Sequence, residues 1–218
     1  MQKGQLSGQI KVFYSDAYKI GMAATEGGLK KTPLLKAVEQ IYLYIDRVIE
    51  SLLAYAKKEG TKIYCRKGCS LCCHQPVYAL THEALFLQDY INDNFSKKET
   101  EDIFKKAREK DKLLTGLQPE ELQNSKYPCP LLKNGTCMAY TARPMACRIY
   151  LSLSFESCRL FYDDPGIESE FPKIMHFPLQ AGRMMNEGFK AALKQAGAET
   201  REYRVEESLL VDLNYPFI

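Results

Sequence analysis

The clearest pattern of apolar and polar positions follows Thr32 and Pro33 and predicts the longest helix of the chain. Thr is a preferred N-cap residue, Pro suits the first helical position, and Gly60 ends the pattern. Between these points apolar residues recur three or four positions apart, as on one face of an amphipathic helix. The residues of this face are Leu35, Val38, Ile41, Tyr42, Ile45, Val48, Ile49, Leu52 and Leu53.

Three further helices follow from similar signals. The first is expected over residues 81–95. Ser96 and Glu99 have the spacing of a capping box, which predicts the start of a second helix that ends near residue 116. The third is expected over about residues 178–196, closed by a glycine.

The remaining segments look irregular. "LQPEELQNSKYP" predicts a short turn of helix and a loop, and Asn134-Gly135 predicts a tight hairpin, but strand signals are otherwise sparse. Residues 1–30 mix glycine, serine and short apolar patches, so we expect an N-terminal arm, either extended or a short helix over the body. The pattern therefore predicts a mainly α protein with one domain over residues 1–218.

Composition excludes several classes of function. Thirty Lys and Arg face 27 Asp and Glu, and a formal charge of +3 is too balanced to predict binding to nucleic acid or to a membrane surface. The chain shows neither a secretory apolar segment nor an uncharged stretch long enough to span a bilayer. We therefore expect a soluble cytoplasmic protein whose partner, another protein or a small molecule, cannot be named from charge.

Cysteine placement is the strongest chemical signal in the sequence. No cysteine falls in the long first helix or in the last one, whereas buried structural thiols would be scattered over apolar faces. In a reducing compartment, such a pattern favours metal binding or catalysis over disulfides. A nucleophilic cysteine–histidine pair is a lesser alternative, because nothing distinguishes one cysteine from the others. The eight cysteines are Cys65, Cys69, Cys72, Cys73, Cys129, Cys137, Cys147 and Cys158.

The stretch "CRKGCSLCC" suits more than one metal ion. As a single helix it would place its four sulfurs on one face, but Cys65 and Cys73 would lie about 12 Å apart along the axis. Two thiolates on one zinc ion lie within about 4.6 Å of each other. The segment must therefore curl, as Gly68 permits, or serve several centres, and the adjacent Cys72 and Cys73 suit a polynuclear site. Eight thiols also exceed the four of one structural zinc, which favours an iron–sulfur cluster, with zinc as the alternative.

Other residues near the cysteines are candidates for supporting such a centre. Thiolate ligands leave negative charge, so Arg143 and Arg148 are predicted to bind and neutralise the cofactor, together with Tyr140 beside it. Arg66 and Lys67 could do the same or form surface ion pairs. Among the histidines, His74 after the double cysteine could be a ligand, while His82 and His176 default to structural roles.

The motifs resemble a family described as a zinc- or iron-chelating domain. Its pattern is C-x3-C-x2-C-C, then C-P-x-L, then C-x2-Y-x2-R-P-x2-C-R, and every element occurs between residues 65 and 158 as "CRKGCSLCC", "CPLL" and "CMAYTARPMACR". The resemblance implies metal binding by the first seven cysteines, and with them Cys158. A relative with the same cysteine motif methylates lysines of flagellin, which offers a lysine N-methylase-like activity as one alternative. No glycine-rich strand-to-helix turn of the doubly wound kind supports methyl transfer here.

The sequence thus predicts helices packed around two cysteine-rich irregular segments that converge on a metal centre. We expect a cysteine-ligated centre, an iron–sulfur cluster before zinc, with a redox or cluster-supported catalytic role. The rival class is a structural zinc module that binds a macromolecule through its helices without catalysis. Metal delivery or storage is a third possibility.

Overall fold

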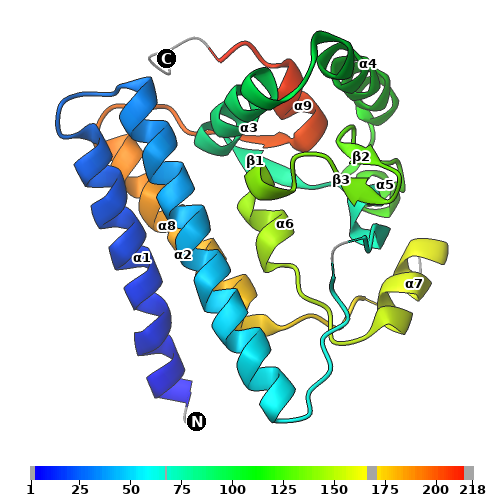
Figure 1. The fold of residues 1–218 in the computed structure, drawn as a ribbon, viewed down its shortest axis with the longest axis horizontal. Coiled ribbons are helices and arrows are strands. Elements are labelled where there is room, and N and C mark those ends of the chain that lie inside the picture. The colour runs from blue at the N-terminus through cyan, green and yellow to red at the C-terminus, as the bar shows by residue number, and fades with distance from the viewer. Residues whose placement is uncertain (1–2, 67, 166–170, 214–218) are drawn as a thin grey trace.

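The computed structural model describes residues 3–66, 68–165 and 171–213, and it is mostly helical, as predicted (Figure 1). The longest helix is α2 (Lys31–Lys58), which buries Leu34, Val38, Ile41 and Ile45 along one face and confirms the predicted amphipathic helix. Its N-cap is Lys30, so Thr32 and Pro33 lie within the first turn, not at its boundary. Gly60 follows the helix with a φ of 70°, a left-handed conformation that glycine adopts without strain.

The N-terminal segment differs from the predicted arm or short helix. α1 (Lys3–Thr25) is a helix of 23 residues that makes its most extensive contacts with α8 (His176–Gln195). Small residues bring the two backbones together: a Cβ on Gly188 would lie 2.1 Å from the carbonyl oxygen of Tyr14, and one on Gly21 would lie 2.7 Å from the Cβ of Ala192. Phe13 also packs on Phe177 here, but small residues take the place of large apolar ones at other positions of the contact, which weakens the apolar period of the segment.

Two apolar clusters form the interior. The first joins α1, α2 and α8 with α6 (Met145–Ile149) and includes Ile45, Met145 and Phe189. The second joins α3 (Thr81–Asn94), α4 (Lys97–Leu114) and α9 (Val205–Leu210) around Leu87 and Ile103. α3, α4 and α8 confirm the three other predicted helices.

Local sequence signals explain the ends of several elements. Ser96 and Glu99 form the predicted capping box at the start of α4, and α5 (Pro119–Asn124) is the predicted turn of helix. The Asn134-Gly135 turn, with φ of 52° and 73°, joins β2 (Leu132–Lys133) to β3 (Thr136–Cys137) as the predicted hairpin. β1 (Tyr78–Leu80) pairs antiparallel with β4 (Glu202–Arg204), a pairing that the sequence analysis did not identify.

Short elements carry the cysteine-rich segments. These elements are η1 (Leu71–His74), η2 (Tyr140–Ala142), α6 and α7 (Phe155–Asp163). In Figure 1 α6 lies between α2 and the β2–β3 hairpin, and α7 lies at the edge of the molecule away from α1 and α2. No helix in the described ranges is both long and apolar enough to cross a membrane.

Candidate metal centre

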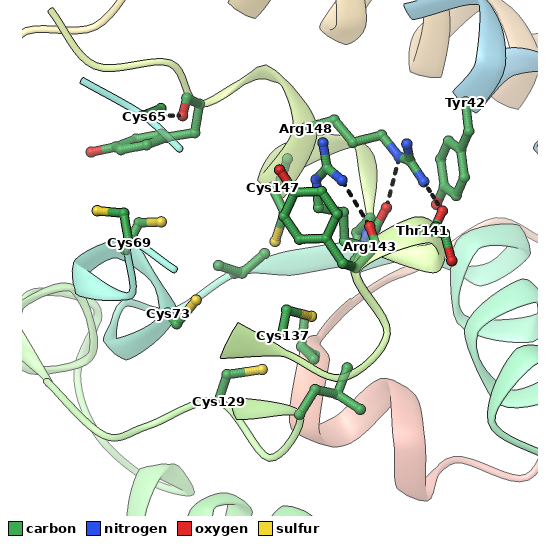
Figure 2. Close-up of a pocket in the computed structure, with 18 of the residues that line it drawn as sticks. Tyr42, Cys65, Cys69, Cys73, Cys129, Cys137, Thr141, Arg143, Cys147 and Arg148 are labelled. Atoms are coloured by element: carbon green, nitrogen blue, oxygen red, sulfur yellow. Dashed lines mark hydrogen bonds between the residues drawn. The ribbon is translucent and has the colours of Figure 1, made fainter. Parts of the chain in front are cut away.

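A pocket of about 800 Å³ lies between α2, the loop before η1, the β2–β3 hairpin and α6 (Figure 2). Seven of the eight predicted ligands line it, and Cys158 in α7 is buried outside the lining. All eight cysteines are free thiols. The seven are Cys65, Cys69, Cys72, Cys73, Cys129, Cys137 and Cys147.

Backbone hydrogen bonds hold the two cysteine-rich segments against each other. The N–H of Cys129 donates to the carbonyl of Cys73 over 2.7 Å, and the N–H of Tyr64 donates to the carbonyl of Ser152 over 3.0 Å. Gly68, with a φ of 92°, turns the first segment as its sequence position suggested. Segments separated by α3 and α4 in the sequence therefore share one pocket.

Four cysteines lie near one another in this pocket. In Figure 2 Cys73, Cys129 and Cys137 lie below Cys147, and the sulfurs of Cys73 and Cys147 point toward the space between them. We call these residues the four-cysteine group. Burial raises the pKa of the Cys129 thiol to about 12 and that of Cys137 to about 11, and it also raises the pKa of Cys147. Neighbouring cysteines of the group, Cys73 among them, further raise the pKa of these three thiols, because neighbouring thiolates repel.

Backbone donors already point at two of these sulfurs. The N–H of Leu131 bonds the sulfur of Cys129, and the N–H of Ala139 bonds the sulfur of Cys137, and each bond lowers the pKa of the thiol it reaches. Hydrogen bonds of this kind stabilise thiolates and tune metal clusters held by them.

Two of the remaining cysteines, Cys65 and Cys158, contact Ser152. The N–H of Ser152 donates to the sulfur of Cys65 over 3.0 Å, and the thiol of Cys158 donates to the hydroxyl of Ser152 over 3.1 Å. Burial raises the pKa of Cys65 and of Cys158, and the nearby Cys69 raises both further. We call Cys65, Cys69 and Cys158 the three-cysteine group.

Cys72 lies between the two groups. Its thiol bonds the sulfur of Cys73, which raises the pKa of Cys72 and lowers that of Cys73 to about 7. Cys147 of the four-cysteine group and Cys65 of the three-cysteine group both raise its pKa further.

The pocket does not contain a preformed site for a single ion. Among the described residues, no three side chains of His, Cys, Asp or Glu meet closely enough to hold one metal ion. The predicted convergence on a metal centre therefore stays a prediction. The donor set consists of soft thiols, which suit zinc and iron alike.

The predicted cofactor-binding residues line the pocket, but their donors mostly point elsewhere. Arg148 is buried, and its guanidinium donates to Asp46, to the carbonyl of Thr141 and, over 2.9 Å, to the carbonyl of Arg143. It also stacks on Tyr42, 4.0 Å from the ring centre. The guanidinium of Arg148 thus stabilises the loop that leads into α6, and its hydrogen bonds go to oxygen atoms of this loop and of Asp46.

Arg143 and Tyr140 form a second stacked pair at the pocket wall. The guanidinium of Arg143 lies 3.9 Å from the ring centre of Tyr140 and donates to the Tyr140 carbonyl over 2.7 Å. Its positive charge lowers the pKa of Cys137 and of Cys147. Arg66 also lines the pocket, whereas Lys67 lies outside the described residues.

Lys110 is a buried cation in the pocket wall that was not predicted from the sequence. Its Nζ lies 3.3 Å from a carboxylate oxygen of Glu206, and both side chains are almost fully buried. Its charge lowers the pKa of Cys73 and of Cys129. In the heavily charged α4 the sequence gives no sign that this lysine, unlike its neighbours, faces inward.

Glu83 in the first turn of α3 was also missed. Its carboxylate accepts hydrogen bonds from the backbone N–H of Leu80 over 2.9 Å, from that of Met145 over 2.7 Å, and from the hydroxyl of Tyr42 over 3.0 Å. The carboxylate therefore caps α3 and the start of α6 together. Since α6 carries Cys147 and Arg148, this buried group fixes one wall of the pocket.

The contacts of the three histidines are made outside the pocket. His74 packs its ring against Tyr162 with 5.1 Å between ring centres, and its Nδ1 lies 3.0 Å from the carbonyl of Ser70. His82 is buried against Phe189, and His176 begins α8. None of the three lines the pocket.

Comparison with known families identifies the cysteine-rich part of the chain. Residues 64–163, slightly under half of the chain, match the CxxCxxCC family, described as "Putative zinc- or iron-chelating domain". This confirms the resemblance seen in the motifs, and it supports metal binding without separating iron from zinc. Comparisons with curated proteins and with solved structures find no match.

Proposed function

We propose that the protein binds an iron–sulfur cluster through the four-cysteine group and uses it in a redox or cluster-supported catalytic role. The observation that carries this proposal is that Cys73, Cys129, Cys137 and Cys147 line one pocket and lie near one another in it. Four thiolates from different elements are the usual ligand set of such a cluster. The seven cysteines of the pocket also exceed the four thiols of one structural zinc, which supports a polynuclear group.

The surrounding residues are suited to a negatively charged centre. Lys110 and Arg143 bring positive charge to opposite members of the group, and the N–H groups of Leu131 and Ala139 bond two of the sulfurs. These contacts offset the charge of the thiolates and would set the reduction potential of a bound cluster. When bound, the cluster would supply one-electron chemistry.

The pocket offers room for a reaction partner beside the cluster. Besides the cysteines it is lined by aromatic and aliphatic side chains, among them Tyr42, Phe86 and Tyr90. A methyl-transfer role has less support, because strands in the described part of the chain form two-stranded sheets only, not a doubly wound sheet.

Anaerobic purification tests the proposal directly. We expect a coloured protein with iron and acid-labile sulfide, measured by metal and sulfide analysis and by its visible spectrum. Cys129→Ser should lose most of the iron, whereas the control His74→Gln, away from the pocket, should keep it. Far-UV circular dichroism checks that both variants are folded. A colourless wild-type protein that holds only zinc would overturn the iron assignment and favour the structural zinc module.

A further inference from the structure

We propose that the pocket binds an organic acid, a small molecule with an apolar body and one carboxylate, and that Arg143 holds the carboxylate. The inference rests on the proposed function, because it names the substrate class of the same pocket. The length of the pocket along α2, its apolar walls and the unused donors of one guanidinium support it.

The pocket extends well beyond the cysteines. Residues on one face of α2 line it from Glu39 to Leu53, which corresponds to about 20 Å along the helix axis. α3 and β1 add Phe86, Tyr90 and Tyr78 to the lining. None of these three elements carries a cysteine. A volume of about 800 Å³ is in the range of small-molecule sites, so a centre held by the cysteines leaves this wall to an organic ligand.

The wall formed by α2, α3 and β1 carries apolar side chains at buried and at exposed positions. Tyr42 is buried and meets Phe86 edge to face, with 5.5 Å between the ring centres. Leu43, Tyr78 and Tyr140 line the same pocket but are 50%, 43% and 39% exposed. Three such side chains around one pocket form an exposed apolar patch, which a ligand with an apolar body would remove from water.

One positive charge beside this wall has no carboxylate of its own among the described residues. Arg143 and Arg148 share the carboxylate of Asp46. One of its oxygens accepts a hydrogen bond from Arg148, and the other lies 3.8 Å from Nη2 of Arg143. Lys110 is already paired with Glu206. A surplus of one charge matches a carboxylate, whereas a phosphate group carries about 1.5 to 2 negative charges.

Arg143 has donors left for such a carboxylate. Its side chain is 16% exposed, and its guanidinium lies over the ring of Tyr140. In the described part of the chain its one hydrogen bond runs from Nη1 to the Tyr140 carbonyl. Stacking leaves the edge of the guanidinium free, so Nε and Nη2 can donate two parallel hydrogen bonds to a carboxylate. The acidic residues Glu39 and Glu50 of the lining are exposed, where water and salt screen their charge from the ligand.

A matched pair of probes tests the carboxylate site. 2-Naphthoate and 2-naphthamide share their apolar rings and differ in charge, and equilibrium dialysis against anaerobically purified protein measures the affinity for each. We expect wild-type protein to bind naphthoate about tenfold more tightly than naphthamide. Arg143→Gln should remove this difference by weakening naphthoate alone, and Leu43→Ser should weaken both probes by the same factor. No binding, equal affinity for the two probes in wild type, or full naphthoate affinity in Arg143→Gln would overturn the inference.

The matched control is Arg159→Gln, which changes an exposed arginine of α7 outside the pocket lining and should bind both probes as wild type does. If Arg143→Gln fails to fold, wild-type protein decides: naphthoate, and not naphthamide, should protect Arg143 from modification by phenylglyoxal, as mapped by peptide mass spectrometry.

Iron analysis of the same samples separates this inference from the proposed function. Discrimination between the probes by a wild-type protein without iron refutes the proposed function alone. An iron-containing protein that does not discriminate refutes the carboxylate site alone. Loss of iron in Arg143→Gln with its preference for naphthoate intact would assign the arginine to the metal centre and also refute the carboxylate site.

Discussion

His82 shows at the scale of one residue how burial changes protonation. The ring is 2% exposed, and its Nδ1 has no hydrogen-bond partner among the described residues. Burial, with a further effect of Lys190, lowers its pKa to about 3. An unfolded histidine has a pKa of about 6.5. Below that pH His82 is therefore protonated in the unfolded chain while it stays neutral in the folded protein.

Acid should therefore destabilise the protein through His82. Between about pH 6.5 and pH 3 the free energy of unfolding should fall by up to about 1.4 kcal/mol per pH unit from this residue. His82→Leu should flatten that part of the curve, as measured by urea unfolding between pH 4 and pH 7. The exposed His176, changed to Gln, serves as the control. An equal slope in His82→Leu and wild type would contradict the assignment.

Lys110 and Glu83 show at the same scale why the site could be predicted only in part. The cysteines were recognisable because thiols with this spacing have few other uses. A lysine or glutamate in a helix normally faces solvent, and only the tertiary structure turns these two inward. Neither residue carries a local signal, so their roles follow from packing alone.

At the scale of elements, the contact between α1 and α8 depends on glycine. Gly188→Ala would place a methyl group 2.1 Å from the carbonyl oxygen of Tyr14, so the helices must separate. We expect a loss of about 1–3 kcal/mol in the free energy of unfolding, as for other overpacked contacts. Gly27→Ala is the matched control, because its new Cβ meets only the end of Lys30, 3.6 Å away. Thermal or urea unfolding measures both, and equal stability would refute the close packing.

The same contact explains which elements the sequence reveals. α2, α3, α4 and α8 have long apolar stripes or capping signals, and their prediction needs no knowledge of their partners. α1 approaches α8 closely at glycine and alanine positions, so its sequence shows only a weak helical period of apolar residues, as an irregular N-terminal arm would. α7 and α9 are too short for a reliable period, and the β1–β4 pair joins residues far apart in the sequence.

At the scale of the whole molecule, the pocket lies where the two apolar clusters meet. Cys65 packs against the first cluster, while Cys129 and Cys137 pack against the second. A bound metal would therefore join two parts of the interior, and a ligand that binds only the folded state stabilises it by mass action.

Metal removal should destabilise the part of the molecule around the pocket more than the α1–α8 contact. In hydrogen exchange of chelated against loaded protein, we expect faster exchange over residues 125–150 and little change in α1 and α8, whose contact is independent of the pocket. The midpoint of thermal unfolding should fall as well. A uniform loss of protection against hydrogen exchange along the chain would instead mean that the whole fold depends on the metal.

The hydrogen bond between Cys129 and Cys73 also orders events during synthesis. A ribosome releases residues 65–73 well before residues 129–158, and α3 and α4 emerge in the interval. Until then the cysteines of residues 65–73 are solvent-accessible thiols that can react with oxidants or bind other metal ions. The proposed centre could form only after the hairpin and α6 have left the exit tunnel, so we expect a nascent chain stalled before residue 129 to hold no metal.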